Sequence, residues 1–443
     1  KRTPEQLVQV TKETLQRLIN SSSSQLLTEP EEKKLEEERN ALLATISKAL
    51  IDMKNILYGD HDSSTAPSSS TAATANPAAV PLEEDKIREL SLQLQSENVL
   101  IQLIQCLALI SFESRKDTVL IYTNLMKKNI ASFAQYITQH HLSIMQFLIE
   151  GYGNAEIAFH CGIMIRESIK YADVLRHILL SNPHDLVWPF IDRFLHLPNF
   201  DIASDGFNTF KELFNATISS HTSSSSSSSN NNNTAPGEVS EQHQLIINEF
   251  FETHGNEFLS KYEILLRSEN YVTRRRSLKL LGELLLDRSH YSLMISYVSS
   301  TANLKTIMHL LRNRSPHITF ETFHIFKIFV ANPNKPSEIA SILFNNKVKL
   351  IAYLENFQND RQDPQFVEEK RLLIETLQQL SDPYEHADHR DRSEERGIFS
   401  RANSKNVDTT SSVEGAPHLL SELERLSLSL IDSSNHGNDR SVS

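Results

Sequence analysis

Apolar residues recur at helical spacing along most of the chain. Thr3 followed by Pro4 is typical of an N-cap and first turn, and it opens the apolar pattern of EQLVQVTKETLQRL. Residues 31–57 begin with charges, continue with apolar residues at helical spacing, and stop at Tyr58-Gly59. No segment alternates apolar and polar residues for long enough to indicate a sheet. The pattern therefore predicts an all-α protein.

A weak internal repeat lies within this helical pattern. In each of four aligned segments, apolar residues stand at the second, tenth and fourteenth positions, which share one broad helix face. The segments are EIAFHCGIMIRESI (156–169), DIASDGFNTFKELF (201–214), YVTRRRSLKLLGEL (271–284) and HITFETFHIFKIFV (317–330), with DTVLIYTNLMKKNI (117–130) as a poorer earlier copy. Their spacing, once a Ser/Asn insertion is removed, matches the period of about 40–47 residues of armadillo and HEAT repeats. The pattern favours a right-handed α-solenoid with a concave face, while a chance alignment of unrelated amphipathic helices remains open.

Low-complexity stretches divide the chain, because they lack the apolar area that offsets ordering entropy. We expect N-terminal helices over residues 1–60, a linker over 61–80, and a helical-repeat domain over 81–380 with a disordered Ser/Asn insertion at 218–238. The tail, 381–443, is expected to be largely disordered apart from a helix over the amphipathic stretch 416–432.

Composition narrows the class of function. The chain has 443 residues and a formal net charge of −12, which argues against general nucleic-acid binding. Only 11 glycines and two cysteines are present, so a disulfide framework is excluded and a reducing compartment such as the cytoplasm is expected. No apolar run approaches the roughly 20 residues of a membrane span.

Signatures of catalysis are missing from the sequence. It contains no phosphate-binding glycine motif, no G-x-S-x-G, no H-E-x-x-H and no calcium-binding loop. His160 and Cys161 are neighbours on one helix and point about 100° apart, which favours a core role over a catalytic dyad. His386 and His389 have helical metal-ligand spacing but stand in the charged stretch HADHRDR, where an incidental pair is the better interpretation. We therefore expect no enzyme activity, no metal and no cofactor.

The stretch NYVTRRRSLKLLGELLLDRSHY (270–291) carries the one candidate binding site. On a helix, Tyr271, Arg275 and Lys279 step by four along one stripe, opposite an arc of leucines. An aromatic wall with two cations suits a short peptide that carries aromatic residues and an acidic group. The alternative is an ordinary solvated surface in which Lys279 pairs with Glu283. From pattern alone, both interpretations stay open.

Longer strings resemble one known family. The calcium-binding protein 39 scaffold family, which includes mouse protein 25 and fungal hymA-like members, is similar over about residues 1–380. The strings that carry the resemblance are MKNILYGD (53–60), FESRKD (112–117), AEIAFHCGIMIRESI (155–169), FDIASDGFNTFKELF (200–214), NYVTRRRSLKLLGELLLDRSHYSLM (270–294), HITFETFHIFKIFVANPNKP (317–336) and ENFQNDR (355–361).

The resemblance implies a bent helical-repeat rod without catalytic activity. It implies a scaffold that binds a germinal-centre-type protein kinase or pseudokinase and holds its kinase domain in the active conformation. The concave face would contact the kinase lobe, and a pocket would receive a Trp-Glu-Phe-like peptide from the partner's C-terminal tail. The positions that match this pocket are Tyr271, Arg275, Lys279, Arg288, Tyr291 and Met308. At Tyr291, relatives commonly carry Phe.

The same resemblance implies a pathway, and the repeat architecture leaves a competing function open. Fungal members act in polarity, morphogenesis and cell separation together with a nuclear Dbf-two-related kinase, so concentration at growth or division sites is expected. The competing function is an armadillo-type adaptor that binds other peptide cargo without activating a kinase. An adaptor for basic peptides would need an acidic groove lined by Asn and Trp, and both the lone Trp188 and the cationic stripe argue against it.

Overall fold

The structure, a computed structural model, describes residues 2–21, 29–58, 81–215 and 241–382. Every regular element in these ranges is a helix, as the periodicity predicts. The linker 61–80, the insertion 218–238, almost all of the tail 381–443 with its helix 416–432, and His386 and His389 lie outside the described residues. The chain divides into two compact units, Lys1–Phe250 and Phe251–Ser443, with the boundary inside α13.

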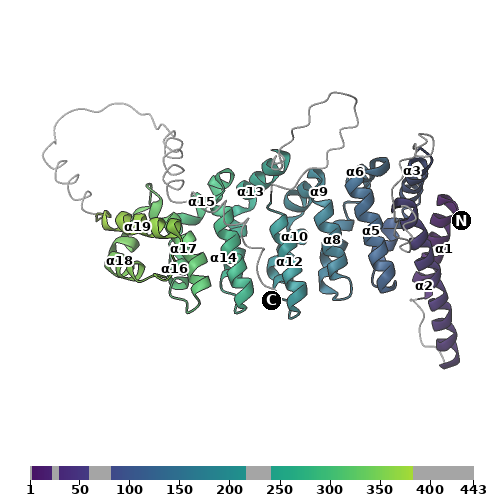
Figure 1. The fold of residues 1–443 in the computed structure, drawn as a ribbon, viewed down its shortest axis with the longest axis horizontal. Helices are drawn as coiled ribbons and strands as arrows, with labels where there is room; N and C mark the ends of the chain where they lie inside the picture. The colour runs from purple at the N-terminus through teal and green to yellow at the C-terminus, as the bar shows by residue number, and fades with distance from the viewer. Residues whose placement is uncertain (1, 22–28, 59–80, 216–240, 383–443) are drawn as a thin grey trace, which may run out of the picture. The chain divides into compact units, whose positions relative to one another are not determined.

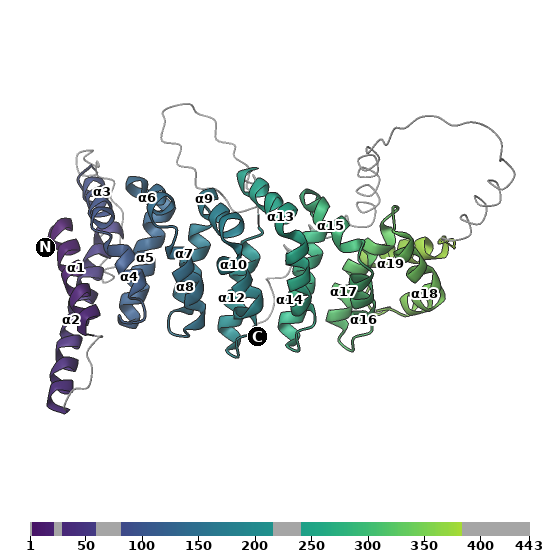
Figure 2. The same cartoon turned by 180° about the vertical axis from the view of Figure 1, so that it is seen from behind.

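The first unit is built from helices whose longer members pack one against the next. Figure 1 shows α2, α5, α8 and α12 side by side in this order, and the reverse view in Figure 2 agrees. The helices are α1 (Pro4–Ser21), α2 (Glu29–Tyr58), α3 (Pro81–Ser96), α4 (Val99–Gln105), α5 (Phe112–Lys128), η1 (Ile130–Ser132), α6 (Phe133–His140), α7 (Ile144–Glu150), η2 (Gly151–Gly153), α8 (Ala158–Ser168), α9 (Ala172–Arg176), η3 (His177–Ser181), α10 (Pro183–Leu186), α11 (Trp188–Asp192), η4 (Phe194–His196) and α12 (Phe200–Glu212).

The second unit is organised around α17. This helix packs against α14, α16 and α19, and α18 packs against α19. The bounds are α13 (Glu241–Leu266, shared with the first unit), α14 (Tyr271–Leu286), η5 (Arg288–His290), α15 (Tyr291–Val298), α16 (Thr301–Leu310), α17 (Pro316–Ala331), α18 (Ser337–Glu355) and α19 (Pro364–Gln378).

The aligned repeat segments become α8, α12, α14 and α17, so the alignment selects one equivalent helix from each repeat. The positions predicted to share a face are buried, apart from the half-buried Val272. They are Ile157, Ile165, Ile169, Ile202, Phe210, Phe214, Leu280, Leu284, Ile318, Phe326 and Val330. The helical-repeat prediction is confirmed.

The start signal predicted for the first helix is present as a cap. The Thr3 hydroxyl accepts a hydrogen bond from the Gln6 amide at 3.3 Å, while the Gln6 side chain accepts one from the Thr3 amide at 3.1 Å. The first helix is therefore fixed by a reciprocal cap.

Buried polar groups fix the packing between repeats. Arg115 donates to the Leu107 carbonyl at 2.8 Å and to the Glu156 carboxylate at 2.6 Å. Lys54 of α2 pairs with the buried Asp117 of α5 at 2.5 Å. Both Arg115 and Asp117 belong to the FESRKD stretch, so at least these two charges of that string serve the fold.

Candidate functional site

The candidate stripe lies on α14, which Asn270 caps. The Asn270 side chain accepts hydrogen bonds from the Val272 and Thr273 amides at 2.9 and 3.2 Å, so the helix begins at Tyr271. Tyr271 is 43% exposed, Arg275 is half-buried and Lys279 is exposed. The leucines of the opposite arc, as predicted, are buried: Leu278, Leu280, Leu281, Leu284 and Leu285.

The neighbouring repeat contributes a carboxylate that the sequence pattern did not reveal. Glu321 of α17 lies with its Oε1 3.7 Å from the Nε of Arg275. Burial raises the pKa of Glu321, while the charges of Arg275 and Lys279 act to lower it. A half-buried arginine thus faces a carboxylate that is incompletely solvated, and an incoming acidic group can compete for the same guanidinium.

The six predicted pocket residues fall into separate places. Arg288 begins η5 and Tyr291 begins α15, both beyond the C-terminal end of α14. Since α14 rises about 1.5 Å per residue, Tyr271 lies roughly 20 Å from that end. Met308 is half-buried on α16. Tyr271 and Arg275 therefore form one patch near the start of α14, Arg288 and Tyr291 form a second patch beyond its end, and a single pocket lined by all six residues stays a prediction.

The three consecutive arginines have different environments, as helical geometry predicts. Arg274 donates from Nε to the Ser268 carbonyl at 2.8 Å, at the N-terminal edge of α14. Burial lowers the pKa of Arg276. Arg275 alone of the three belongs to the stripe with Tyr271 and Lys279, so the run of cations is not one charged surface.

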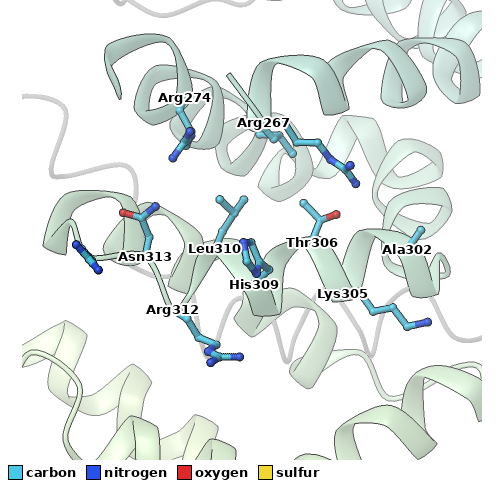
Figure 3. A pocket seen from close by; sticks show the side chains of 11 residues that line it. Arg267, Arg274, Ala302, Lys305, Thr306, His309, Leu310, Arg312 and Asn313 are labelled. Atoms are coloured by element: carbon cyan, nitrogen blue, oxygen red, sulfur yellow. The ribbon is translucent and has the colours of Figure 1, made fainter. Parts of the chain in front are cut away.

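A second feature of the same unit is a cavity of about 930 Å³, which the sequence analysis did not anticipate. Figure 3 shows Arg267 and Arg274 on one side of it, across from Thr306, Leu310 and Asn313. The remaining lining residues are Leu266, Ala302, Lys305, His309, Arg312 and Arg314. The available signal in the sequence was the closeness of Lys305 to the arginines 312 and 314, with His309 between them. Met308 is not among the lining residues, so this cavity differs from the predicted peptide pocket.

His160 and Cys161, the neighbouring pair noted in the sequence, pack in the hydrophobic core. His160 packs edge-on against Phe112 with ring centroids 5.9 Å apart, and burial lowers its pKa. Cys161 is buried, and burial raises the pKa of its thiol to about 12, which leaves little thiolate at neutral pH. Within the described ranges, no group of three or more His, Cys, Asp or Glu side chains is arranged to hold a metal ion. None of the helices described there is both long and apolar enough to cross a bilayer.

The fold defines a helical-repeat protein, and its two candidate sites, the α14 stripe and the cationic cavity, suit peptide binding. Comparison with known proteins then identifies the family. The Mo25-like family model matches residues 1–234 and 237–381. The chain belongs to the Mo25-like family, a family of helical-repeat scaffold proteins.

Relatives from animals and fungi agree with this assignment. The chain is 38% identical to the human calcium-binding protein 39-like protein, over 76% of this chain and 86% of the relative. It is 39% identical to the Mo25-like protein of Schizosaccharomyces pombe, over 68% of this chain and 84% of the relative. It is 30% identical to the conidiophore development protein hymA of Emericella nidulans, over 67% and 78% respectively. The family resemblance read from the sequence is therefore confirmed.

Proposed function

We propose that this protein is a non-catalytic scaffold that binds a germinal-centre-type protein kinase or pseudokinase and activates it allosterically. The observation that carries the proposal is the stripe Tyr271–Arg275–Lys279, which offers an aromatic ring and two cations on one exposed face of α14. Membership of the Mo25-like family supports a scaffold role.

The stripe suits a tail peptide of the Trp-Glu-Phe type. The exposed ring of Tyr271 offers a surface for an aromatic side chain, and the half-buried Met308 of α16 is our candidate for a second apolar contact. Arg275 and Lys279 supply charge for the peptide's glutamate or terminal carboxylate. The pair of Arg275 with Glu321 keeps that guanidinium oriented before a ligand arrives.

A second surface, in the first unit, suits a folded partner such as a kinase lobe. Three helices that pack side by side expose large apolar side chains: Phe112 of α5 is 58% exposed, Phe159 and Ile163 of α8 are each 43% exposed, and Phe200 of α12 is 54% exposed. Because α8 packs between α5 and α12, these side chains belong to neighbouring repeats. Exposed apolar groups gathered on a protein surface are typical of protein interfaces.

Two such contacts explain activation without any chemistry from the scaffold. A surface that binds only the active arrangement of the kinase shifts the population toward it. A change from mostly inactive to mostly active requires about 5.5 kcal/mol of differential affinity. A tethered tail peptide raises the effective concentration of the lobe contact, so a modest lobe affinity suffices. The name of the hymA relative, which refers to conidiophore development, supports a role in morphogenesis.

The pocket assignment is tested with a labelled peptide that ends in Trp-Glu-Phe. The double variant Arg275→Ala, Met308→Ala is expected to bind it at least about tenfold more weakly, since it loses a charge-assisted hydrogen bond and an apolar contact. The control variant Lys349→Ala, Met308→Leu removes an exposed cation of α18 and keeps the apolar volume. Equal binding by the double variant and the control would contradict the assignment.

If the protein is an adaptor that does not activate a kinase, we expect a different result from the kinase assay. The protein would then bind the tail peptide through Arg275 but leave the activity of the full-length kinase unchanged. A nuclear Dbf-two-related kinase is the proposed further member of the complex. Affinity purification of the protein with mass spectrometry identifies which kinase is present in stoichiometric amounts, and imaging tests the proposed cytoplasmic location at growth or division sites.

A further inference from the structure

The cavity between α13, α14 and α16 is strongly cationic in a protein whose overall charge is strongly negative. Its lining includes the arginines 267, 274, 312 and 314, together with Lys305 and His309. The chain as a whole carries a formal net charge of −12. A local excess of cations on an acidic protein concentrates anionic ligands at that place and repels them elsewhere.

Most of this charge is not neutralised by the described part of the protein. Glu263 of α13 accepts hydrogen bonds from the Arg267 side chain and from the Thr306 hydroxyl, both at 2.8 Å. Among the described residues, no carboxylate lies within ion-pair distance of Lys305, Arg312 or Arg314, and all three are exposed. The cavity therefore has cations available for a ligand.

The cations are arranged along a line. Lys305 lies on α16, and Arg312 lies in the turn that continues this helix beyond Leu310, where the Leu311 and Arg312 amides donate to the Ile307 and His309 carbonyls at 2.9 and 3.1 Å; Figure 3 shows both side chains. At about 1.5 Å per residue, the line from Lys305 to Arg312 is about 10 Å long. An extended peptide covers the same length in about three residues, at about 3.3 Å each. We propose that this cavity binds a phosphorylated peptide segment in which two phosphoserines are separated by two residues.

Phosphate fits these side chains better than a carboxylate does. Each phosphoserine carries nearly two negative charges and three acceptor oxygens, and arginine guanidinium groups bind such oxygens in pairs. Single ion pairs between exposed side chains contribute little, so several dianion contacts are needed for useful affinity. The proposal does not rest on the tail-peptide site, because Tyr271, Arg275, Lys279 and Met308 do not line the cavity.

The test uses the whole protein and a labelled synthetic peptide of Gly and Ala with phosphoserine, two spacer residues and phosphoserine. We expect the phosphopeptide to bind at least about tenfold more tightly than its unphosphorylated counterpart, with affinity that falls as salt rises. The charge-reversing double variant Lys305→Glu, Arg312→Glu should abolish this binding. The matched control Lys349→Glu, on the exposed surface of α18, should retain it.

Two further measurements separate this proposal from others. Binding of the Trp-Glu-Phe peptide to the double variant should stay unchanged, which shows a folded protein and an independent site. Inositol hexakisphosphate and a single-stranded RNA of equal charge are tested as competitors. Equal binding of the phosphorylated and unphosphorylated peptides, unchanged binding by the double variant, or tighter binding of either competitor than of the phosphopeptide would overturn the proposal.

Discussion

Arg275 of α14 lies with its Nε 3.7 Å from Oε1 of Glu321, on the neighbouring helix α17. The arginine side chain is 43% exposed and the glutamate side chain 13% exposed, so the carboxylate lies beneath the cation. Because Glu321 contacts Arg275 from the buried side, the solvent-facing side of the guanidinium group can still contact a ligand. We therefore expect the same carboxylate to compete with an acidic group of a ligand that approaches Arg275 from solvent.

Replacing Glu321 with glutamine removes this competition. The variant Glu321→Gln should bind the Trp-Glu-Phe peptide more tightly, by about fivefold, because a partly exposed ion pair is worth about 1 kcal/mol. Isothermal titration calorimetry measures the change, with the exposed Glu355→Gln on α18 as the matched control. Unchanged or weaker binding by Glu321→Gln would show that Arg275 does not contact the peptide's acidic group.

Gly162 is required by a buried hydrogen-bond network. A Cβ at this position would overlap the Asp205 carboxylate and the Tyr152 hydroxyl, which bond to each other at 2.9 Å. Gly162→Ala should destabilise the protein by about 1–3 kcal/mol, as overpacking does. Gly282, within α14, is the comparison position, because a methyl group added there would lie 3.8 Å from its nearest neighbour, Ile325.

The matched variant Gly282→Ala should therefore be neutral or stabilising by up to about 1 kcal/mol. Thermal unfolding followed by circular dichroism distinguishes the two variants. The account of the Tyr152–Asp205 network fails if both substitutions change the midpoint in the same direction and by the same amount.

A buried ion pair joins α17 to α19. The Nζ of Lys327 lies 2.7 Å from Oε2 of Glu369, and both side chains are almost fully buried. Burial lowers the pKa of Lys327, and the Glu369 carboxylate raises it. Lys327→Met should cost about 3–5 kcal/mol, because it leaves a carboxylate buried without its cation.

The double variant Lys327→Met, Glu369→Leu should recover most of that loss, since two apolar side chains need no charge compensation. The free energies of unfolding of the natural protein, the two single variants and the double variant, measured in urea, form a double-mutant cycle. If the effects of the two single substitutions simply add, the two charges are not coupled.

Stability should depend on pH through His324. Burial and the neighbouring cations Lys327 and Arg361 lower its pKa to about 3, although the Glu369 carboxylate lies 3.8 Å from its Nδ1. A histidine whose pKa is lowered by folding binds protons more readily in the unfolded chain. Its contribution to stability is therefore complete above about pH 6.5 and is lost as the pH falls toward 3.

The variant His324→Phe removes this proton linkage while keeping a ring beside Phe320. Unfolding free energies measured by urea titration between pH 7 and pH 4 should fall less steeply for the variant than for the natural protein. Parallel curves would mean that His324 titrates normally in the folded state.

Features that depend only on residues close together in the sequence can be predicted from the sequence alone. The Thr3 cap follows from a local start signal, and the buried repeat positions and the shared stripe on α14 follow from helical periodicity. Glu321 could not be paired with Arg275 in advance, because the contact depends on how one repeat packs on the next. The cationic cavity was missed for the same reason, since Arg274 and Arg312 come from different elements.

The six pocket positions illustrate the same limit. The family resemblance assigned them to one pocket, and the length of α14 separates Tyr271 from Arg288. The role of both patches in binding stays a prediction.

The central claim is that this scaffold activates a kinase. Its most direct test measures the activity of a purified full-length germinal-centre-type kinase while the protein is titrated to equimolar amounts. We expect the kinase activity to rise at least about tenfold, and we expect Arg275→Ala with Met308→Ala to shift this rise to higher protein concentrations. A kinase that binds the protein stoichiometrically with no change in activity would contradict the claim.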